Sequence, residues 1–399
     1  MTATSQEISR CLRLNSKTIC SVHCSVVDAI DLAAVDCRNL TSCAFKKLSA
    51  KPNLNAILIY NMNLKVLRLE SVKELHVTHF DNVQLPHLKQ LSLFGTPCDD
   101  VLLIAIINAT DVLQRLSIGK CVNITDEGLI TIAKHCPQLR SIGLDELPIT
   151  DAGLKELTVL CPLIDCLSLA GNELITDAGL NFVTKNFKEL RSLDLSDCNV
   201  TDLSLQYLTL HSASTLEDLY LVGVEQVRVD VLVHFLRQCQ QLRYLVLDCD
   251  IDSYCADIVP HMKHLKGLLT FGILSDDCLC LIARHCKKLR MLGIPCSFKV
   301  GPDVVAAAHR SAVEASLGDV RMMYCADEDT TKDDPTYTDK GLLALVEGLS
   351  ELQWVYSPRV NADSNEDTLL HSMVQRMWQK LCPGLQFETS YDIFCIYVL

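Results

Sequence analysis

Aromatic residues, basic residues and long apolar stretches are all scarce in this sequence. Phe, Trp and Tyr make up 6% of its 399 residues, so aliphatic side chains must fill most of the interior. The formal net charge of −13 disfavours nonspecific binding to nucleic acid or anionic membranes, because both need a basic surface. The longest apolar run, residues 101–107, is far shorter than the roughly 20 residues that cross a bilayer. We therefore expect neither a nucleic-acid partner nor a membrane partner.

Targeting and cofactor-binding motifs are also missing. The first ten residues include Glu7 and Arg10 and no apolar segment of the kind a secretory signal needs. Cys395 is fifth from the end and not fourth, so the prenylation motif is not met. Phosphate-binding loops and dinucleotide fingerprints are absent. The expectation is a soluble cytoplasmic protein, with the nucleus as an alternative, that is not an enzyme and uses no cofactor.

What the sequence does have is a repeat. Apolar anchor residues recur every 25 or 26 positions, at Leu113, Leu139, Ile164, Leu190, Leu216 and Leu242. Residues 113–138 read LQRLSIGKCVNITDEGLITIAKHCPQ, and the L-x-x-L-x-L stretch at the start predicts a short strand with inward leucines. Thr125 and Asp126 predict the start of a helix, and Pro137 its end. Gly128 is expected to allow close packing between neighbouring repeats.

Many of the 21 cysteines follow the same period. Without a secretory signal they should stay reduced. Those at repeated positions are expected to form ladders of small buried side chains, namely Cys121 and Cys198 after the strand, and Cys136, Cys161, Cys239 and Cys286 at the helix end.

The ITDAGL and VTDLSL copies at residues 149–154, 175–180 and 200–205 extend this pattern. From about residue 88 to 295, the chain resembles the cysteine-containing leucine-rich repeats of F-box/LRR proteins and of the antagonist-of-mitotic-exit-network family. The resemblance implies an α/β leucine-rich-repeat solenoid, a horseshoe with a parallel concave β-sheet and convex helices. It implies a protein-binding function as an adaptor or scaffold. As an alternative, it implies the substrate-recognition subunit of a cullin-based SCF-type ubiquitin ligase, which would contact the adaptor of that ligase.

The resemblance does not extend to a recognisable F-box. That motif begins with Leu-Pro and carries a tryptophan near its end, whereas here the repeat pattern begins by Val27 and the first tryptophan is Trp354. This departure weakens the prediction of direct assembly into a ligase.

The predicted domain organisation has four parts. Residues 1–26 form an N-terminal cap, 27–87 irregular short turns, 88–316 regular repeats, and 317–399 degenerate repeats with an acidic insertion and a C-terminal cap. In the second part, strands are expected from Val27 to Leu32 and at residues 54–59. Residues 40–48 are expected to replace a helix, and residues 64–69 and 72–77 to form abbreviated turns. In the last part, residues 326–337 are the acidic insertion, residues 370–387 an amphipathic helix, and residues 391–399 a final strand.

The variable positions beside the strand leucines should line the concave face. They are often acidic and include two tyrosines, a residue type enriched at binding hot spots. The hypothesis is a surface for a basic peptide or protein; the alternative is a solvated polar face. The candidate residues are Arg115, Lys120, Asp145, Glu146, Asp194, Asp197, Asp218, Tyr220, Tyr244 and Asp248.

Other patterns have mainly structural interpretations. The Leu-Arg pairs at Arg140, Arg191, Arg243 and Arg290 should form ion pairs with neighbouring repeats, with a basic ridge as the alternative. The insertion contains Thr330 and Thr331 in acidic surroundings, which a kinase could modify, although a solvated loop is the preferred interpretation.

Metal and thiol chemistry have little support. Cys20, His23 and Cys24, followed by Cys37 and Cys43, lack a second pair at zinc-finger spacing, so no metal is expected. The repeated pairs His135-Cys136 and His285-Cys286 fall at helix ends, where a structural role explains them.

Overall fold

The computed structural model describes residues 21–24, 42–46, 54–224, 226–248, 251–270, 274–293, 344, 348, 354–356, 385–390 and 393–398. The chain divides into two compact units, residues 1–190 (unit 1) and residues 191–399 (unit 2). Each unit is described by itself.

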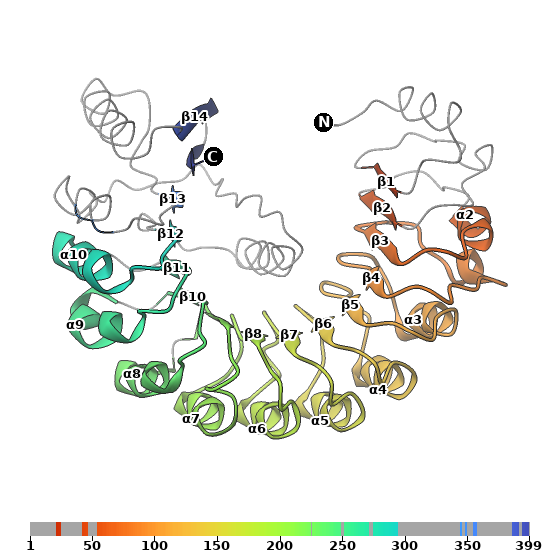
Figure 1. The fold of residues 1–399 in the computed structure, drawn as a ribbon. Helices are drawn as coiled ribbons and strands as arrows, with labels where there is room; N and C mark the ends of the chain where they lie inside the picture. Colours follow the sequence, from red (N-terminus) through yellow and green to blue (C-terminus); the bar gives the residue numbers. More distant parts are fainter. Residues whose placement is uncertain are drawn as a thin grey trace. The chain divides into compact units, whose positions relative to one another are not determined.

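Unit 1 alternates strands and helices along the chain. Its strands are β1 (Ser21–Cys24), β2 (Ser42–Lys46), β3 (Val66–Glu70), β4 (Gln90–Ser92), β5 (Arg115–Ser117), β6 (Ser141–Gly143) and β7 (Cys166–Ser168). Each pairs with the next in parallel. The helices between them are α2 (Leu54–Tyr60), the 3-10 helix η2 (Val77–Phe80), α3 (Asp100–Ile107), α4 (Asp126–His135) and α5 (Asp151–Leu160), and α6 (Asp177–Asn186) follows β7. Figure 1 shows these helices along one side of the strand row.

Unit 2 continues the same alternation. Its parallel strands are β8 (Ser192–Asp194), β9 (Asp218–Leu221), β10 (Tyr244–Leu247), β11 (Gly267–Thr270), β12 (Met291–Gly293) and β13 (Trp354–Tyr356). The helices are α7 (Asp202–His211), α8 (Val229–Gln238), η3 (Asp252–Tyr254), α9 (Cys255–Ile258), η4 (Val259–His261) and α10 (Asp276–His285). A separate antiparallel hairpin joins β14 (Leu385–Ser390) to β15 (Ile393–Val398).

The inward leucines of the strands form the core. Leu116, Leu167, Leu219 and Leu245 occupy the same repeat position and are at most 2% exposed. The helices contribute the other half of this interior, as Leu129 and Ile132 of α4 do. Burial of such side chains is the main favourable term in folding. The predicted fold class, an α/β leucine-rich-repeat solenoid with a parallel sheet, is confirmed.

The Thr-Asp pairs were predicted to cap helices, and they do more than that. The Thr125 and Thr150 hydroxyls accept hydrogen bonds from the backbone two residues later, which confirms the caps. In addition, the Asp126 carboxylate accepts from the Thr150 backbone N–H at 2.8 Å and from its Oγ1 at 2.6 Å. Asp151 makes the same two bonds to Thr176. Each helix start is therefore fixed by the preceding repeat.

The glycine in the first helical turn makes room for that carboxylate. A Cβ added to Gly153 would lie 2.3 Å from Asp126 Oδ1, and one added to Gly128 would lie 2.1 Å from Asp100 Oδ1. The predicted close packing at Gly128 is confirmed, and its physical cause is the aspartate of the neighbouring repeat.

The cysteine ladders are also confirmed. Cys121 and Cys161 are fully buried, and the other repeated cysteines are at most 6% exposed. Cys121 Sγ donates to the Leu93 carbonyl at 3.2 Å, and Cys161 Sγ to the Cys136 carbonyl at 3.4 Å. These thiols contact the carbonyl groups of the preceding repeat.

Two predictions near the N-terminus are wrong. Residues 42–46, expected to replace a helix, form β2, and residues 54–59, expected to form a strand, lie in α2. Leu54 and Leu58 are buried at helical spacing, whereas the alternation of Leu54, Ile57 and Ile59 suggested a strand. In a short apolar segment both periods fit equally well.

The abbreviated turn expected at 64–69 contains most of β3, while residues 72–77 lead from β3 into η2. The strand predicted between Val27 and Leu32, the insertion at 326–337 and residues 370–384 of the expected helix lie outside the described residues. For residues 385–387 the helix prediction is wrong, because they form the start of β14, which pairs with β15. The final apolar strand is present as β15, paired with β14. Among the described residues, no helix combines the length and apolar character needed to cross a membrane.

We predict that Asp126→Ala lowers the free energy of unfolding by about 1.5–3 kcal/mol, the usual range for hydrogen bonds to a charged group. Glu127→Ala is the matched control, because it removes a neighbouring acid from the same helical turn, and it should cost much less. Urea denaturation followed by circular dichroism measures both. Equal losses would show that the helix dipole, and not the link to Thr150, accounts for the effect.

The aspartate and the glycine should also be energetically coupled. Gly153→Ala alone should destabilise the chain because the new methyl group meets the Asp126 carboxylate. In the Asp126→Ala background the same change should cost less, since the obstructing oxygen is gone. Additive effects in this double-mutant cycle would contradict the proposed contact.

Candidate protein-binding surface

The strand row has one face toward the helices and one face away from them, which we call the open face. Side chains alternate along each strand, so the residues between the inward leucines point to the open face. On unit 1 these include Arg115, Ser117, Ser141 and Ser168, and on unit 2 Ser192, Asp194, Asp218, Tyr220, Tyr244 and Val246.

Three candidate residues lie just beyond the strands, in a turn with left-handed backbone. Lys120, Glu146 and Asp197 have φ angles of 60°, 52° and 54°. The equivalent position is glycine in the next repeats, Gly171 and Gly223, also with positive φ. A side chain there costs about 1–2 kcal/mol. Their position is thus dictated by the turn, and Lys120 Nζ lies 3.2 Å from Glu146 Oε1.

Asp145 is buried in unit 1, although it follows directly after β6. It is 6% exposed, and its Oδ1 accepts a hydrogen bond from the Ser168 hydroxyl of the next repeat. A Cβ at Gly119 would lie 2.9 Å from Asp145 Oδ2, so the carboxylate also occupies space left by that glycine. Asp145 thereby joins neighbouring repeats.

Asp194 is likewise buried, in unit 2. It is fully shielded from solvent, and its Oδ1 accepts from the Ser196 backbone N–H at 2.9 Å. Neither Asp145 nor Asp194 is placed to meet a partner in solution. For Asp145, sequence reasoning missed this because the groups around its carboxylate, Ser168 and Gly119, lie in other repeats.

An apolar platform occupies the open face of unit 2. Tyr220 and Val246 pair across β9 and β10, form a buried cluster with Val222, and have the half-buried Leu269 packed against them. We call Tyr220, Tyr244, Val246 and Leu269 the platform. The inward leucines already supply the core, so folding of the repeat does not require apolar residues at these positions.

Two glycines shape this platform. A Cβ at Gly267 would lie 2.5 Å from the Tyr244 ring, and one at Gly293 would lie 1.9 Å from Leu269 Cδ1. The Tyr244 and Leu269 side chains therefore lie across the neighbouring strand, over positions that have no side chain of their own. The result is a flattened aromatic and aliphatic surface.

Acidic residues border the platform. Asp218 pairs with Tyr244 across β9 and β10, and both are half-buried. Burial and the nearby Asp218 carboxylate raise the pKa of the Tyr244 hydroxyl. Asp248 is exposed at the end of β10, with its Oδ2 accepting from the Gly223 backbone N–H at 2.6 Å.

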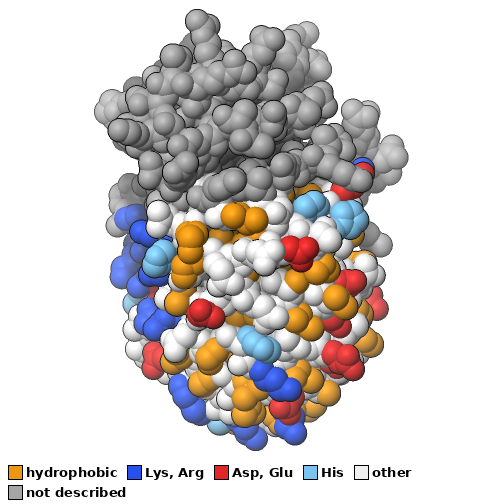
Figure 2. Space-filling model, turned by 90° about the vertical axis from the view of Figure 1, so that its right-hand side faces the viewer, with side chains coloured by type: hydrophobic (Ala, Val, Ile, Leu, Met, Phe, Trp, Pro, Cys, Tyr) orange, Lys and Arg blue, Asp and Glu red, His pale blue; other side chains and the backbone are white. Residues whose placement is uncertain are grey.

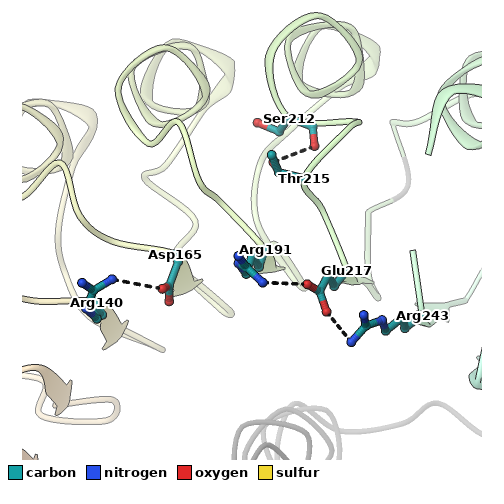
Figure 3. Close-up of polar contacts among 7 residues, drawn as sticks. All are labelled: Arg140, Asp165, Arg191, Ser212, Thr215, Glu217 and Arg243. Carbon is teal, nitrogen blue, oxygen red and sulfur yellow. Dashed lines mark hydrogen bonds and ion pairs between the residues drawn. The ribbon is translucent and has the colours of Figure 1, made fainter. Parts of the chain in front are cut away.

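The predicted ion pairs of the Leu-Arg positions are confirmed for three arginines. In unit 1, Arg140 Nη1 lies 3.9 Å from Asp165 Oδ2. In unit 2, Glu217 lies between two arginines, 3.0 Å from Arg191 and 2.8 Å from Arg243 (Figure 3). These positions follow each other along the start of the strands.

No group of three or more metal-binding side chains converges among the described residues. Cys20 and Cys37 lie outside them, as do the side chains of His23, Cys24 and Cys43. His135 lies at the end of α4, where its Nδ1 is 2.9 Å from the Thr131 carbonyl oxygen. Burial raises the pKa of Cys136 and of Cys286 to about 12, so neither is an activated nucleophile.

Comparisons with known proteins agree with the repeat architecture. A family model described as "Leucine Rich repeat" matches residues 112–133 and 189–208. Coronatine-insensitive protein homolog 1a of Oryza sativa is 28% identical over 238 residues, covering 52% of this chain and 39% of that protein. F-box/LRR-repeat protein 4 of Bos taurus is 36% identical over 111 residues, covering 27% of this chain and 18% of that protein.

Among solved structures, an internalin of Listeria monocytogenes matches with a TM-score of 0.46 at 17% identity, covering 73% of this chain and 87% of that one. The chain spans about two fifths of the length of the first curated relatives. Leucine-rich repeats are thus present in this chain, and proteins of the F-box/LRR type are among its relatives.

Thiol reactivity provides a check on the ladder assignment. At pH 8 in folded protein, Cys136 should resist iodoacetamide because its pKa of about 12 leaves almost no thiolate. The half-buried Cys166 should be alkylated faster. Mass spectrometry of the cysteine-containing peptides separates the two sites, and urea-unfolded protein is the control in which both react. Equal labelling in the folded state would contradict the burial of the ladder.

Proposed function

We propose that this leucine-rich-repeat chain, whose relatives include F-box/LRR proteins, is a non-catalytic recognition solenoid that acts as an adaptor or scaffold. Its partner binds the open face of unit 2, on the platform and its acidic border. The observation that carries this proposal is the platform itself, an aromatic and aliphatic surface on the side of the strands away from the helices.

The chemistry of the platform defines the partner. Tyr244 and Leu269 are half-buried beside the buried Tyr220 and Val246, so their exposed parts offer apolar contact area to a partner. Contiguous apolar patches of this kind mark interaction sites, and tyrosine is enriched among the residues that dominate binding energy. Asp218 and Asp248 add negative charge beside it. A protein segment with an apolar residue flanked by basic ones fits this surface.

The original set of ten candidate residues is narrowed by this proposal. Asp218, Tyr244 and Asp248 keep their assignment to binding, while the buried Tyr220 supports the platform through its packing. Asp145 is assigned to joining repeats and Asp194 to a buried hydrogen bond with the Ser196 backbone. Lys120, Glu146 and Asp197 belong to the left-handed turns. Arg115 is half-buried on the open face of unit 1.

The double variant Asp218→Lys, Tyr244→Ala should lower recovery of the specific partner about tenfold or more, since loss of one tyrosine hot spot alone can do so. The measurement is affinity purification from a native extract with quantitative mass spectrometry. The matched control is Asp111→Lys, Tyr207→Ala, which makes the same chemical changes outside the open face. Unchanged capture by the first variant, or equal loss in the control, would rule out this surface.

A second candidate function is substrate recognition in a cullin-based ubiquitin ligase. It is supported by the similarity to a relative named F-box/LRR-repeat protein 4. Under this proposal the protein should co-purify with the adaptor and cullin subunits of such a ligase, and the platform variant should keep those subunits while it loses the substrate. Absence of both subunits from the purified complex would leave the adaptor or scaffold function.

A further inference from the structure

Basic side chains gather on unit 2 at the edge where helices end and strands begin. Arg237, Lys263, Arg284 and Lys288 are exposed there, and His264 and Lys266 are half-buried. We call these six residues the basic edge. They come from three successive repeats, at the ends of α8, η4 and α10.

Electrostatic contacts show that these residues share one surface. Arg237 Nε donates a hydrogen bond to His261 Nε2 at 3.1 Å. The pKa of His261 is lowered by burial and then by the charges of Arg237 and Lys263. The pKa of His264 is lowered by burial and then by Lys263 and Lys288. Cations from separate repeats therefore lie close enough to His261 and His264 to lower the pKa of both imidazoles.

The backbone ladder extends this surface along the strand starts. The Lys266 N–H donates to the Arg243 carbonyl at 2.7 Å, and the Arg290 N–H donates to the Lys266 carbonyl at 2.7 Å. Earlier in the row, Glu217 lies between Arg191 and Arg243 and balances their charge. Among the described residues of unit 2, the corresponding places after Arg243 hold Lys266 and Arg290.

Helix polarity explains only part of this charge. Arg237 and Arg284 lie in last helical turns, where cations are favoured by the helix dipole. Lys263, Lys266 and Lys288 lie outside the helices, so the dipole does not account for them. In the described part of unit 2, no ion pair joins these three lysines to a carboxylate. The neighbouring Lys287 differs, because its ammonium donates to the Ala283 and Gly348 carbonyls.

We propose that the basic edge is a second interaction surface, which binds a carboxylate-rich segment of a partner protein. Like charges held close together lower stability, and a row of acidic side chains on a partner would neutralise them. This surface is distinct from the platform, so it goes beyond the function proposed above.

The observations favour an acidic protein segment over nucleic acid. The chain carries a net charge of −13, which disfavours binding of a long polyanion that reaches beyond a local basic surface. Residues 261–266 and 284–290 contain no Phe, Trp or Tyr on which a base could stack. A short acidic peptide can contact the edge alone, whereas a duplex would extend past it.

The test uses the full chain and a fluorescein-labelled oligoglutamate peptide, with binding followed by fluorescence anisotropy at low and at physiological salt. The variant is Lys263→Glu, Lys266→Glu, Lys288→Glu. Its matched control, Lys73→Glu, Lys155→Glu, Lys185→Glu, makes the same charge change at exposed lysines of unit 1. Oligothymidylate of matched length serves as the nucleic-acid probe. If the glutamate variant does not fold, the variant with alanine at the three edge lysines is measured instead.

We expect salt-sensitive binding of oligoglutamate that falls about tenfold or more in the edge variant and by less than about twofold in the control. Equal losses of binding in the two variants would mean that only the net charge of the chain matters, and would overturn the proposal. Unchanged binding in the edge variant would also overturn it. Oligothymidylate binding as tight as that of oligoglutamate, lost in the same variant, would assign the edge to nucleic acid instead.

Discussion

The hydrogen bonds from one aspartate to the start of the next helix are the constraint on which the rest of each unit depends. Asp126 accepts from both the backbone and the hydroxyl of Thr150, while the Thr150 hydroxyl caps its own helix. One helix cap is therefore made by two repeats, and no repeat can satisfy its own backbone alone. The same carboxylate requires a glycine at position 153, because any larger residue would displace it. This is how a local sequence motif fixes the distance between neighbouring repeats.

A solenoid built this way has a chemical polarity that an ordinary globular domain lacks. Within unit 1, successive helices run in the same direction, so their first turns, with acids such as Asp126 and Asp151, line one edge. Their last turns, with bases such as Lys134 and Lys185, line the other. Figure 2 shows blue side chains at the left and along the bottom of the described surface, while red ones are more frequent at the right. The helix dipole favours this separation of acidic and basic side chains. A few further charges in the connecting turns are then enough to form a binding edge.

The regular repeats could be predicted from the sequence because strand, cap and helix signals recur together within 26 residues. The region around residues 42–60 could not, since a single short apolar segment fits both a strand and a helix period. The burial of Asp145 could not be predicted from the sequence either. It depends on a serine 23 residues later and on the missing side chain of Gly119, which only the three-dimensional register brings together. The variable strand positions of unit 2 lie on the open face, but the sequence did not indicate which of its acids are accessible.

The sites proposed for partners lie where the repeat becomes less regular. From β9 onward, Tyr220 and Leu269 take the open-face position that holds Ser117, Gly143 and Ser168 in unit 1. Tyr244 takes the position of Arg115, Ser141 and Cys166, and glycines at the adjoining positions let the Tyr244 and Leu269 side chains lie flat. In the same repeats the alternation of arginine and acid ends at Arg243, and Lys266 follows without an acidic neighbour in the row. Positions bound by the inter-repeat hydrogen bonds cannot vary in this way without loss of stability. Departures from the repeat are tolerated at positions outside these bonds, and the open face of unit 2 and its helix-end edge are two surfaces where selection for a partner can act.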